Sequence, residues 1–129
     1  MDDSVLFDTD IFIWVQRGHP KAAALIDRAE VRCLSVQTYL ELLQGAQNRD
    51  QQRLAKQFLA DLDFTLLPLT ETIGHRAMVY IEEYGLATGL RAGDARIAAT
   101  AAEHALQLVT SNAKHFKSIR GLRVKPFRP

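Results

Sequence analysis

The residues best suited to chemistry in this chain form four acidic or polar sites, each at or near the end of an apolar run. They are Asp8 and Asp10 in VLFDTDIFI, Glu41 in LSVQTYLELL, Asp94 in RAGDARIAATA, and Thr110, Ser111 and Asn112 after LQLV. Apolar runs that end in this way are typical of a parallel sheet whose strand ends meet at one polar crevice. Carboxylates gathered there repel one another, so the pattern predicts a hard cation such as Mg²⁺ or Mn²⁺.

Asp8 and Asp10 flank the expected junction between the first strand and the first helix. Asp8 directly follows the apolar run Val5-Leu6-Phe7. Aspartate is a preferred N-cap residue, so capping alone explains Asp8, and metal ligation is the alternative. Asp10 either reaches the same site or simply favours the positive end of the helix. We expect Asp10 to support the site rather than to bind a metal directly.

Glu41 lies in a segment that is expected to form a helix capped by Ser35. At roughly 100° per residue, one apolar stripe runs along this helix, and Glu41 falls on a polar strip outside it. The stripe consists of Val36, Tyr39, Leu40 and Leu43. The periodicity therefore predicts that Glu41 lies on a solvated face, and the border of a cleft is the alternative.

Asp94 is the most diagnostic single residue. It precedes Ile97, Ala98, Ala101 and Ala105 by helical spacing, which puts it in line with the helix face that packs inward. Burying an unpaired carboxylate costs several kcal/mol, so helix amides or a cation must compensate for it. The small alanines let this helix approach the sheet closely and bring Asp94 toward the strand ends.

Thr110, Ser111 and Asn112 offer oxygens that can hold metal-bound water or phosphate, although such residues are also common in turns. The four histidines show no zinc-ligand spacing, and there is one cysteine. The chain has no glycine-rich phosphate loop, GxSxG elbow or GxGxxG motif. An all-oxygen site that holds Mg²⁺ suits hydrolysis of a phosphodiester by activated water.

Short β-rich runs alternate with helical patterns along the chain. The predicted strands cover residues 4–7, 31–34, 64–68, 106–109 and 122–124. The predicted helices cover residues 9–16, 20–30, 36–43, 50–62, 70–85 and 94–105, with Asp50 and Thr70 as caps, a loop over 85–93 and one helical turn within 112–117. This alternation predicts an α/β fold with a parallel sheet covered on both faces.

The bulk properties bound the fold and its setting. A length of 129 residues with 47% hydrophobic and 24% charged side chains predicts one globular domain over residues 1–129. The single Cys33, expected to be buried, cannot form an internal disulfide and favours a reducing compartment. The opening MDDSV resembles no secretory signal, and no apolar run is long enough for a membrane span. We therefore expect a cytoplasmic protein with no membrane partner.

Charge is distributed unevenly along the sequence. The net charge is +1, yet residues 111–129 hold six basic side chains and no acidic one. A basic end near an acidic cluster can steer a polyanion toward bound metal, and an ordinary solvated surface is the alternative.

Taken together, these motifs resemble those of the PIN-domain nucleases, in particular the VapC toxins of type II toxin-antitoxin modules. The resemblance covers essentially the whole chain. VLFDTDIFI is similar to the first family motif, LSVQTYLELLQGA to the second, GDARIAATAAEHA to the third and LVTSNAKHF to the fourth. The resemblance implies a three-layer α/β/α sandwich with a mainly parallel sheet of four to five strands.

The resemblance also implies an activity, Mg²⁺-dependent endoribonuclease cleavage with water as the nucleophile. Asp8 and Asp94 would be the main metal ligands, Glu41 a ligand or a base that orients water, and Asn112 a weaker contributor, with Asp10 and Thr110 in support. Asn112 and His115 depart from the fully acidic family pattern, which puts a second metal in doubt. The implied partners are an RNA substrate, a second copy in a homodimer and a cognate VapB-like antitoxin that covers the active site.

Three other interpretations fit parts of the sequence. FDTDIF resembles the nucleophile motif of haloacid-dehalogenase-type phosphatases, but no acidic pair follows Thr110 as that chemistry requires. A receiver domain needs a phosphoacceptor aspartate at the end of the third strand, and FTLLPLTET offers none. The third alternative is a catalytically weak PIN domain that acts as an RNA-binding or protein-interaction module, for which Asn112 and His115 are the best support.

Overall fold

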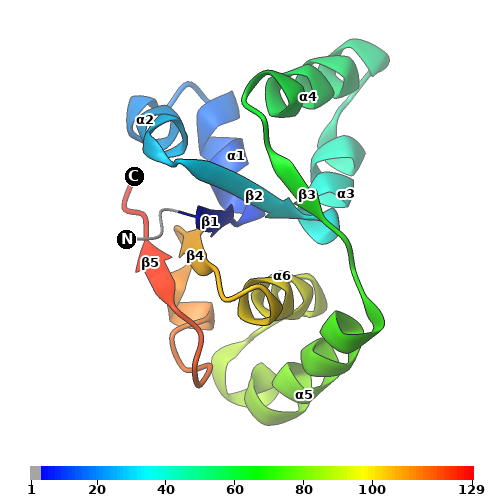
Figure 1. Ribbon diagram of the computed structural model, residues 1–129, viewed down its shortest axis with the longest axis vertical. Helices are drawn as coiled ribbons and strands as arrows, with labels where there is room; N and C mark the ends of the chain where they lie inside the picture. Colours follow the sequence, from blue (N-terminus) through cyan, green and yellow to red (C-terminus); the bar gives the residue numbers. More distant parts are fainter. Residues whose placement is uncertain (1–3) are drawn as a thin grey trace.

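The computed structural model describes residues 4–129, and its centre is a five-stranded sheet in the order β3-β2-β1-β4-β5 (Figure 1). Every neighbouring pair of strands is parallel. The elements are β1 (Ser4–Phe7), α1 (Thr9–Gln16), α2 (Pro20–Arg28), β2 (Val31–Ser35), α3 (Val36–Gly45), α4 (Arg49–Asp61), β3 (Thr65–Leu67), α5 (Glu71–Thr88), α6 (Ala92–Glu103), β4 (Gln107–Thr110), the 3₁₀ turn η1 (Ala113–His115) and β5 (Val124–Pro126).

The two faces of the sheet are covered by two separate hydrophobic clusters. Side chains alternate across a strand, so neighbours in register share a face. One cluster contains Leu6, Cys33 and Leu108 together with apolar residues of α5 and α6. The other contains Phe7, Leu34 and Val109 together with apolar residues of α1, α2, α3 and α4.

Figure 1 shows the same layers, with α5 and α6 on one side of the sheet and α1 to α4 on the other. The predicted three-layer α/β/α sandwich with a parallel sheet is therefore confirmed, as is the burial of Cys33. Across the residues described, no helix has the length and apolar character that crossing a bilayer requires.

Several helix starts follow from local hydrogen bonds. The hydroxyls of Ser35 and Thr70 accept from the backbone N–H groups three residues on, so both predicted N-caps are confirmed. The predicted cap at Asp50 is wrong: the side chain of Asn48 caps α4 by accepting from the N–H of Gln51. Asp50 instead lies in the first turn, where a negative charge suits the helix dipole.

The bounds of α5, α6 and β5 also differ from the prediction. Helix α5 continues past Gly85 to Thr88 and ends at Gly89, whose φ of 77° gives the left-handed C-terminal conformation. Helix α6 begins at Ala92 instead of Asp94 and ends before Ala105, whose φ is 53°. Strand β5 lies two residues later than predicted because it pairs through Val124 with β4.

Candidate active site

Asp8 lies at the carboxyl end of β1, beside the end of β4. Its backbone N–H donates to the carbonyl of Val109 at 2.9 Å, which continues the pairing of the two strands. Its Oδ1 accepts from the N–H of Thr9 at 2.8 Å and so caps α1, and its Oδ2 accepts from the Thr110 hydroxyl at 2.8 Å. The predicted cap is therefore real, and the same carboxylate also faces the neighbouring strand end. Burial, and next the charge of Asp10, raise the pKa of Asp8 to about 7.

Asp10 binds the chain that leaves β4. Its Oδ2 accepts from the N–H of Ser111 at 3.1 Å, from the Ser111 hydroxyl at 2.5 Å and from the Thr110 hydroxyl at 3.3 Å. Its Oδ1 is buried and has no hydrogen-bond partner among residues 4–129. Burial raises the pKa of Asp10. Thr110 thus contacts both Asp8 and Asp10, as a residue that supports both carboxylates would.

Glu41 corrects the periodicity argument. The face that α3 buries contains Thr38 and Leu42, whereas Leu40 of the predicted stripe is 51% exposed. Glu41 follows Thr38 by three residues and is half-buried on that side, so its predicted solvated face is wrong. Its Oε1 accepts from the hydroxyl of Thr9, and its Oε2 accepts from the Gln37 side-chain amide at 3.0 Å.

Asp94 lies in the first turn of α6, next to Glu41 on the facing helix. Its Oδ2 accepts from the N–H of Arg91 at 3.3 Å and lies 3.7 Å from Nδ1 of His115. Burial raises the pKa of Asp94, and the charge of Glu41 raises it further. The predicted inward face is confirmed for Ile97, which is 1% exposed, although α6 ends before it reaches Ala105.

Asn112 and His115 form the fourth edge of the site. The backbone N–H of Asn112 donates to the Thr110 hydroxyl at 3.0 Å, and its amide Nδ2 lies 2.7 Å from Nδ1 of His115. Since the amide nitrogen can only donate, that ring nitrogen acts as the acceptor. The side chain of Asn112 is therefore engaged by His115, which in turn lies between Asn112 and Asp94.

Three carboxylates, those of Asp8 after β1, Glu41 on α3 and Asp94 on α6, thus lie close enough to interact at one end of the sheet. The charge of Asp94 helps to raise the pKa of Asp8, and the charge of Glu41 helps to raise the pKa of Asp94. This end lies beyond β1 and β4, where the strand order reverses direction and open α/β sheets form their ligand crevice.

The site has the donor chemistry of a hard divalent cation, namely carboxylate, hydroxyl and amide oxygens. The partnerless, buried Oδ1 of Asp10 and the mutual repulsion of the acids both favour a positive charge there. Within residues 4–129, however, no group of three His, Cys, Asp or Glu side chains is already arranged to hold a metal ion. The residues fit the cation by chemistry and charge.

Comparison with known proteins decides the family. The family model described as PIN domain matches residues 5–122. The chain belongs to the PIN-domain family. A search of curated proteins found no match.

Solved structures of similar chains cover this PIN domain almost completely. A chain of a toxin-antitoxin complex from Klebsiella pneumoniae is 31% identical, with a TM-score of 0.82 over 98% of this chain and 100% of that one. A chain of FitAcB from Neisseria gonorrhoeae is 26% identical, with a TM-score of 0.72 over 93% and 95%. A chain of VapBC-1 from nontypeable Haemophilus influenzae is 25% identical, with a TM-score of 0.76 over 95% and 96%.

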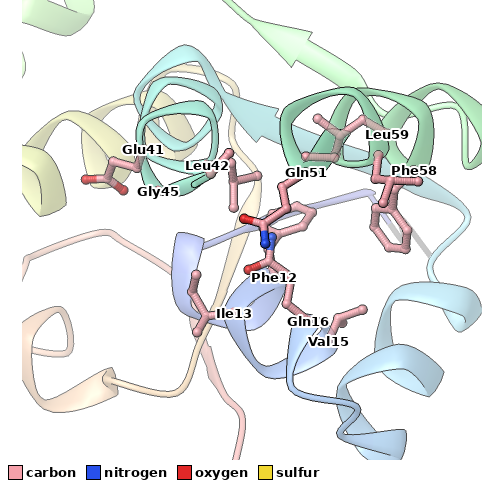
Figure 2. A pocket seen from close by; sticks show the side chains of 13 residues that line it. Phe12, Ile13, Val15, Gln16, Glu41, Leu42, Gly45, Gln51, Phe58 and Leu59 are labelled. Atoms are coloured by element: carbon pink, nitrogen blue, oxygen red, sulfur yellow. The ribbon is translucent and has the colours of Figure 1, made fainter. Parts of the chain in front are cut away.

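An apolar groove of about 460 Å³ runs between α1, α3 and α4 of this PIN domain (Figure 2). Glu41 lies at one end of the groove (Figure 2), and its carboxylate is close to Gly93 in the first turn of α6. Most of the lining is apolar, including Phe12, Ile13, Leu42, Leu54 and Phe58. Periodicity did not reveal this groove because its lining comes from three separate helices.

Three residues of this PIN domain that were not predicted from the sequence contact Glu41 directly or through one neighbour. Thr9, between the two aspartates, donates to Glu41, and Gln37 does so from one helical turn earlier. Arg96, two residues after Asp94, reaches Gln37. The i,i+4 spacing of Gln37 and Glu41 was the available signal, because side chains four residues apart are neighbours on a helix.

Proposed function

We propose that this protein is a Mg²⁺-dependent endoribonuclease, the toxin of a toxin-antitoxin module, that hydrolyses RNA phosphodiester bonds. The observation that carries the proposal is the cluster of Asp8, Glu41 and Asp94 at the sheet's switch point in a PIN domain. Burial and neighbouring acids raise the pKa of Asp8 and of Asp94, and such raised values in a crevice are typical of functional sites. The similarity to chains of toxin-antitoxin complexes supports the biological role.

Mg²⁺, or Mn²⁺ in its place, would supply an activated water and offset charge on the phosphodiester in its transition state. In this proposal Asp8 and Asp94 are the main ligands, and Glu41 is a ligand or orients the water. Asn112 contributes more weakly because an amide has no charge and cannot act as a base. Thr110 holds Asp8 in place through its hydroxyl, and Asp10 adds negative field.

The basic C-terminal stretch supplies candidate contacts to RNA phosphates, which position a substrate without specifying its sequence. Lys114 lies in η1, two residues after Asn112. Arg123, by contrast, donates to the carbonyl of Ala105 at the opposite end of β4. We therefore propose Lys114, and not Arg123, as a contact beside the cleavage site.

The test is cleavage of RNA by purified protein with Mg²⁺ and with a chelator. Asp94→Asn removes one proposed ligand charge and should abolish cleavage, whereas the matched control Asp27→Asn changes an exposed acid on α2 and should leave cleavage intact. Cleavage that persists in excess chelator, or that Asp94→Asn leaves unchanged, would contradict the proposal.

The second candidate is a PIN domain that binds RNA or protein but cuts poorly. Asn112 and His115 favour it, because the fourth edge of the site has no acid and its amide is already engaged. Equal RNA binding with and without Mg²⁺, together with no cleavage at any Mg²⁺ concentration, would support this candidate over the enzyme.

The proposed partners are a cognate VapB-like antitoxin and a second copy of the chain, in the cytoplasm, with residues 1–129 acting as one domain. The groove of Figure 2 is the apolar surface next to Glu41 that an antitoxin segment could cover. Leu54→Glu places a charge in that groove and should weaken antitoxin binding while cleavage persists. Leu86→Glu, on fully exposed Leu86 of α5, is the control for a surface on the other side of the sheet.

A further inference from the structure

A chain of side chains connects Glu41 to a cation on the neighbouring helix. The Gln37 amide Nε2 donates to Glu41 Oε2 at 3.0 Å, and Arg96 Nη1 donates to Gln37 Oε1 at 3.0 Å. Gln37 and Glu41 are on α3, whereas Arg96 is on α6 two residues after Asp94. This series of hydrogen-bonded side chains therefore joins the two helices that carry the two half-buried acids of the site.

The chemistry of the donors fixes the direction of this chain. A guanidinium has N–H donors and no acceptor, so the Gln37 atom that faces Arg96 must be the amide oxygen. The amide nitrogen then faces Glu41, which as a carboxylate only accepts. Reversing the amide would break both hydrogen bonds at once. Arg96 thus determines which end of Gln37 meets Glu41.

We infer that Gln37 and Arg96 are positioning residues that aim Glu41 at the cation site while keeping the guanidinium off the carboxylate. The inference rests on the proposed function. A direct arginine pair would occupy both carboxylate oxygens in a fork and compete with a bound cation. The amide occupies one lone pair of Oε2 and the Thr9 hydroxyl one lone pair of Oε1, so each oxygen retains another for a ligand.

The first turn of α6 also packs closely against Glu41 and Gln37 and restricts where their side chains can lie. A Cβ at Gly93 would lie 2.9 Å from Glu41 Oε2 and 3.3 Å from Gln37 Nε2. Glycine at this position therefore lets the first turn of α6 approach both side chains. Glu41 is fixed on three sides, by Thr9, Gln37 and the backbone at Gly93.

The experiment measures Mn²⁺ binding by the purified full chain, from the magnetic resonance signal of free Mn²⁺, alongside RNA cleavage as a function of Mg²⁺ concentration. Gln37→Met and Arg96→Met keep the length of each side chain and remove its hydrogen bonds. Each should raise the Mn²⁺ dissociation constant and the half-maximal Mg²⁺ concentration by about 10-fold, the usual cost of losing a group that orients a metal ligand. The thermal midpoint should change little.

Two further variants separate positioning from a merely structural tie between α3 and α6. Because Arg96 acts through Gln37, the double variant should bind Mn²⁺ no more weakly than Gln37→Met alone. Arg96→Lys keeps a cationic donor and should restore most of the Mn²⁺ affinity.

Elsewhere the protein contains a matched control contact for each substitution. Gln57→Met removes another i,i+4 hydrogen bond to an acid, that from Gln57 Nε2 to Asp61 Oδ1 at 2.7 Å on α4. Arg76→Met removes another arginine contact between helices, that to Glu103. Neither control should alter Mn²⁺ affinity.

The outcomes distinguish this inference from the proposed function. If the wild type binds Mn²⁺ and cleaves RNA, but Gln37→Met and Arg96→Met match it in both measurements, the positioning role is wrong and the nuclease proposal stands. Additive losses in the double variant would overturn it as well. If the wild type neither binds Mn²⁺ nor cleaves RNA, the proposed function itself fails, and the positioning role fails with it.

Discussion

The two sides of the carboxylate cluster are constructed differently. On the strand side, Asp8 is 6% exposed, hydrogen-bonded through its backbone to β4 and through its side chain to Thr110. On the helix side, Glu41 and Asp94 are only half-buried. Glu41 is held by the side chains of Thr9 and Gln37, and Asp94 by one backbone N–H, with Nδ1 of His115 lying 3.7 Å from its Oδ2.

The acids on the two sides are therefore positioned by different parts of the structure. The strand-side acid is positioned by the sheet itself, so changes there act on folding and on chemistry together. On the helix side, Glu41 is positioned by side chains and Asp94 by a backbone N–H at the start of its own helix. The core does not need these contacts, so changes there should act on chemistry alone. Substitutions on the two sides should therefore differ in whether they change stability together with cleavage or cleavage alone.

The largest expected effect is that of Asp8→Asn, which should abolish cleavage and stabilise the metal-free protein. The pKa of Asp8 rises from 3.8 to about 7 on folding, so between these values the folded carboxyl is protonated while the unfolded one is ionised. The unfolded state then binds fewer protons, and wild-type stability falls as the pH rises through this range. Asparagine does not titrate and avoids this loss.

The measurement for Asp8→Asn is the thermal midpoint in chelator at pH 5 and at pH 8. The wild-type midpoint should fall between these values by roughly 5–10 °C more than that of the variant. If the thermal midpoints of the wild type and the variant changed equally with pH, the pKa of Asp8 would not be raised by folding.

Thr110→Val should impair both folding and cleavage, as expected for the strand side. Valine has a similar shape but removes the hydroxyl that contacts Asp8 and Asp10. Leaving buried acceptors unpaired costs about 1–3 kcal/mol of stability. We expect cleavage to fall by up to about 100-fold, since the hydroxyl orients a proposed metal ligand.

The control for Thr110→Val is Thr100→Val, which removes a fully buried hydroxyl that donates to the carbonyl of Arg96 within α6. It should lower the thermal midpoint and leave the cleavage rate near that of the wild type. If Thr100→Val lost cleavage and Thr110→Val did not, the claim that strand-side contacts control both stability and cleavage would be contradicted.

The strand side was also the more predictable from sequence. Strand and helix periods, together with caps such as Ser35, depend on local chemistry, which is why the layers and most elements were predicted correctly. Asp8 ends an apolar run, and a parallel strand presents its last residue at the crevice by construction. The errors at Asp50 and Asp94 are displacements of one or two residues along helix starts.

The helix side was less predictable because its geometry depends on contacts between segments far apart in sequence. The stripe chosen for α3 was wrong since Thr38, a polar residue, is the one that α3 buries together with Leu42. Its burial follows from hydroxyl contacts with Thr9 and Ser35, which no hydropathy pattern encodes. The roles of Asp8, Glu41, Asp94 and Asn112 as catalytic or metal-binding residues remain predictions.

Gly93→Ala should impair cleavage without impairing folding, as expected for the helix side. The added Cβ would lie 2.9 Å from Glu41 Oε2, the end of a flexible side chain, so Glu41 would move rather than the helices. We expect about a 10-fold loss of cleavage, comparable to that from losing an orienting contact.

The control for Gly93→Ala is Gly74→Ala in α5, where a Cβ meets no atom within 4 Å among the residues described. Replacing a helical glycine there should raise stability by up to about 1 kcal/mol and leave cleavage unaltered. A large fall in the thermal midpoint of Gly93→Ala would show that the helix side is tied to the core after all.

The smallest expected effect is that of His115→Ala, at the point where the two sides meet. His115 accepts from the Asn112 amide, and its Nδ1 lies 3.7 Å from Asp94 Oδ2. A contact of this length between half-buried side chains contributes at most about 1 kcal/mol, so cleavage should fall by no more than about 5-fold. His104→Ala, at an exposed position after α6, is the control and should change nothing. A loss as large as that of Gly93→Ala would mean that His115 contacts the substrate, and that the fourth edge belongs to the reacting site.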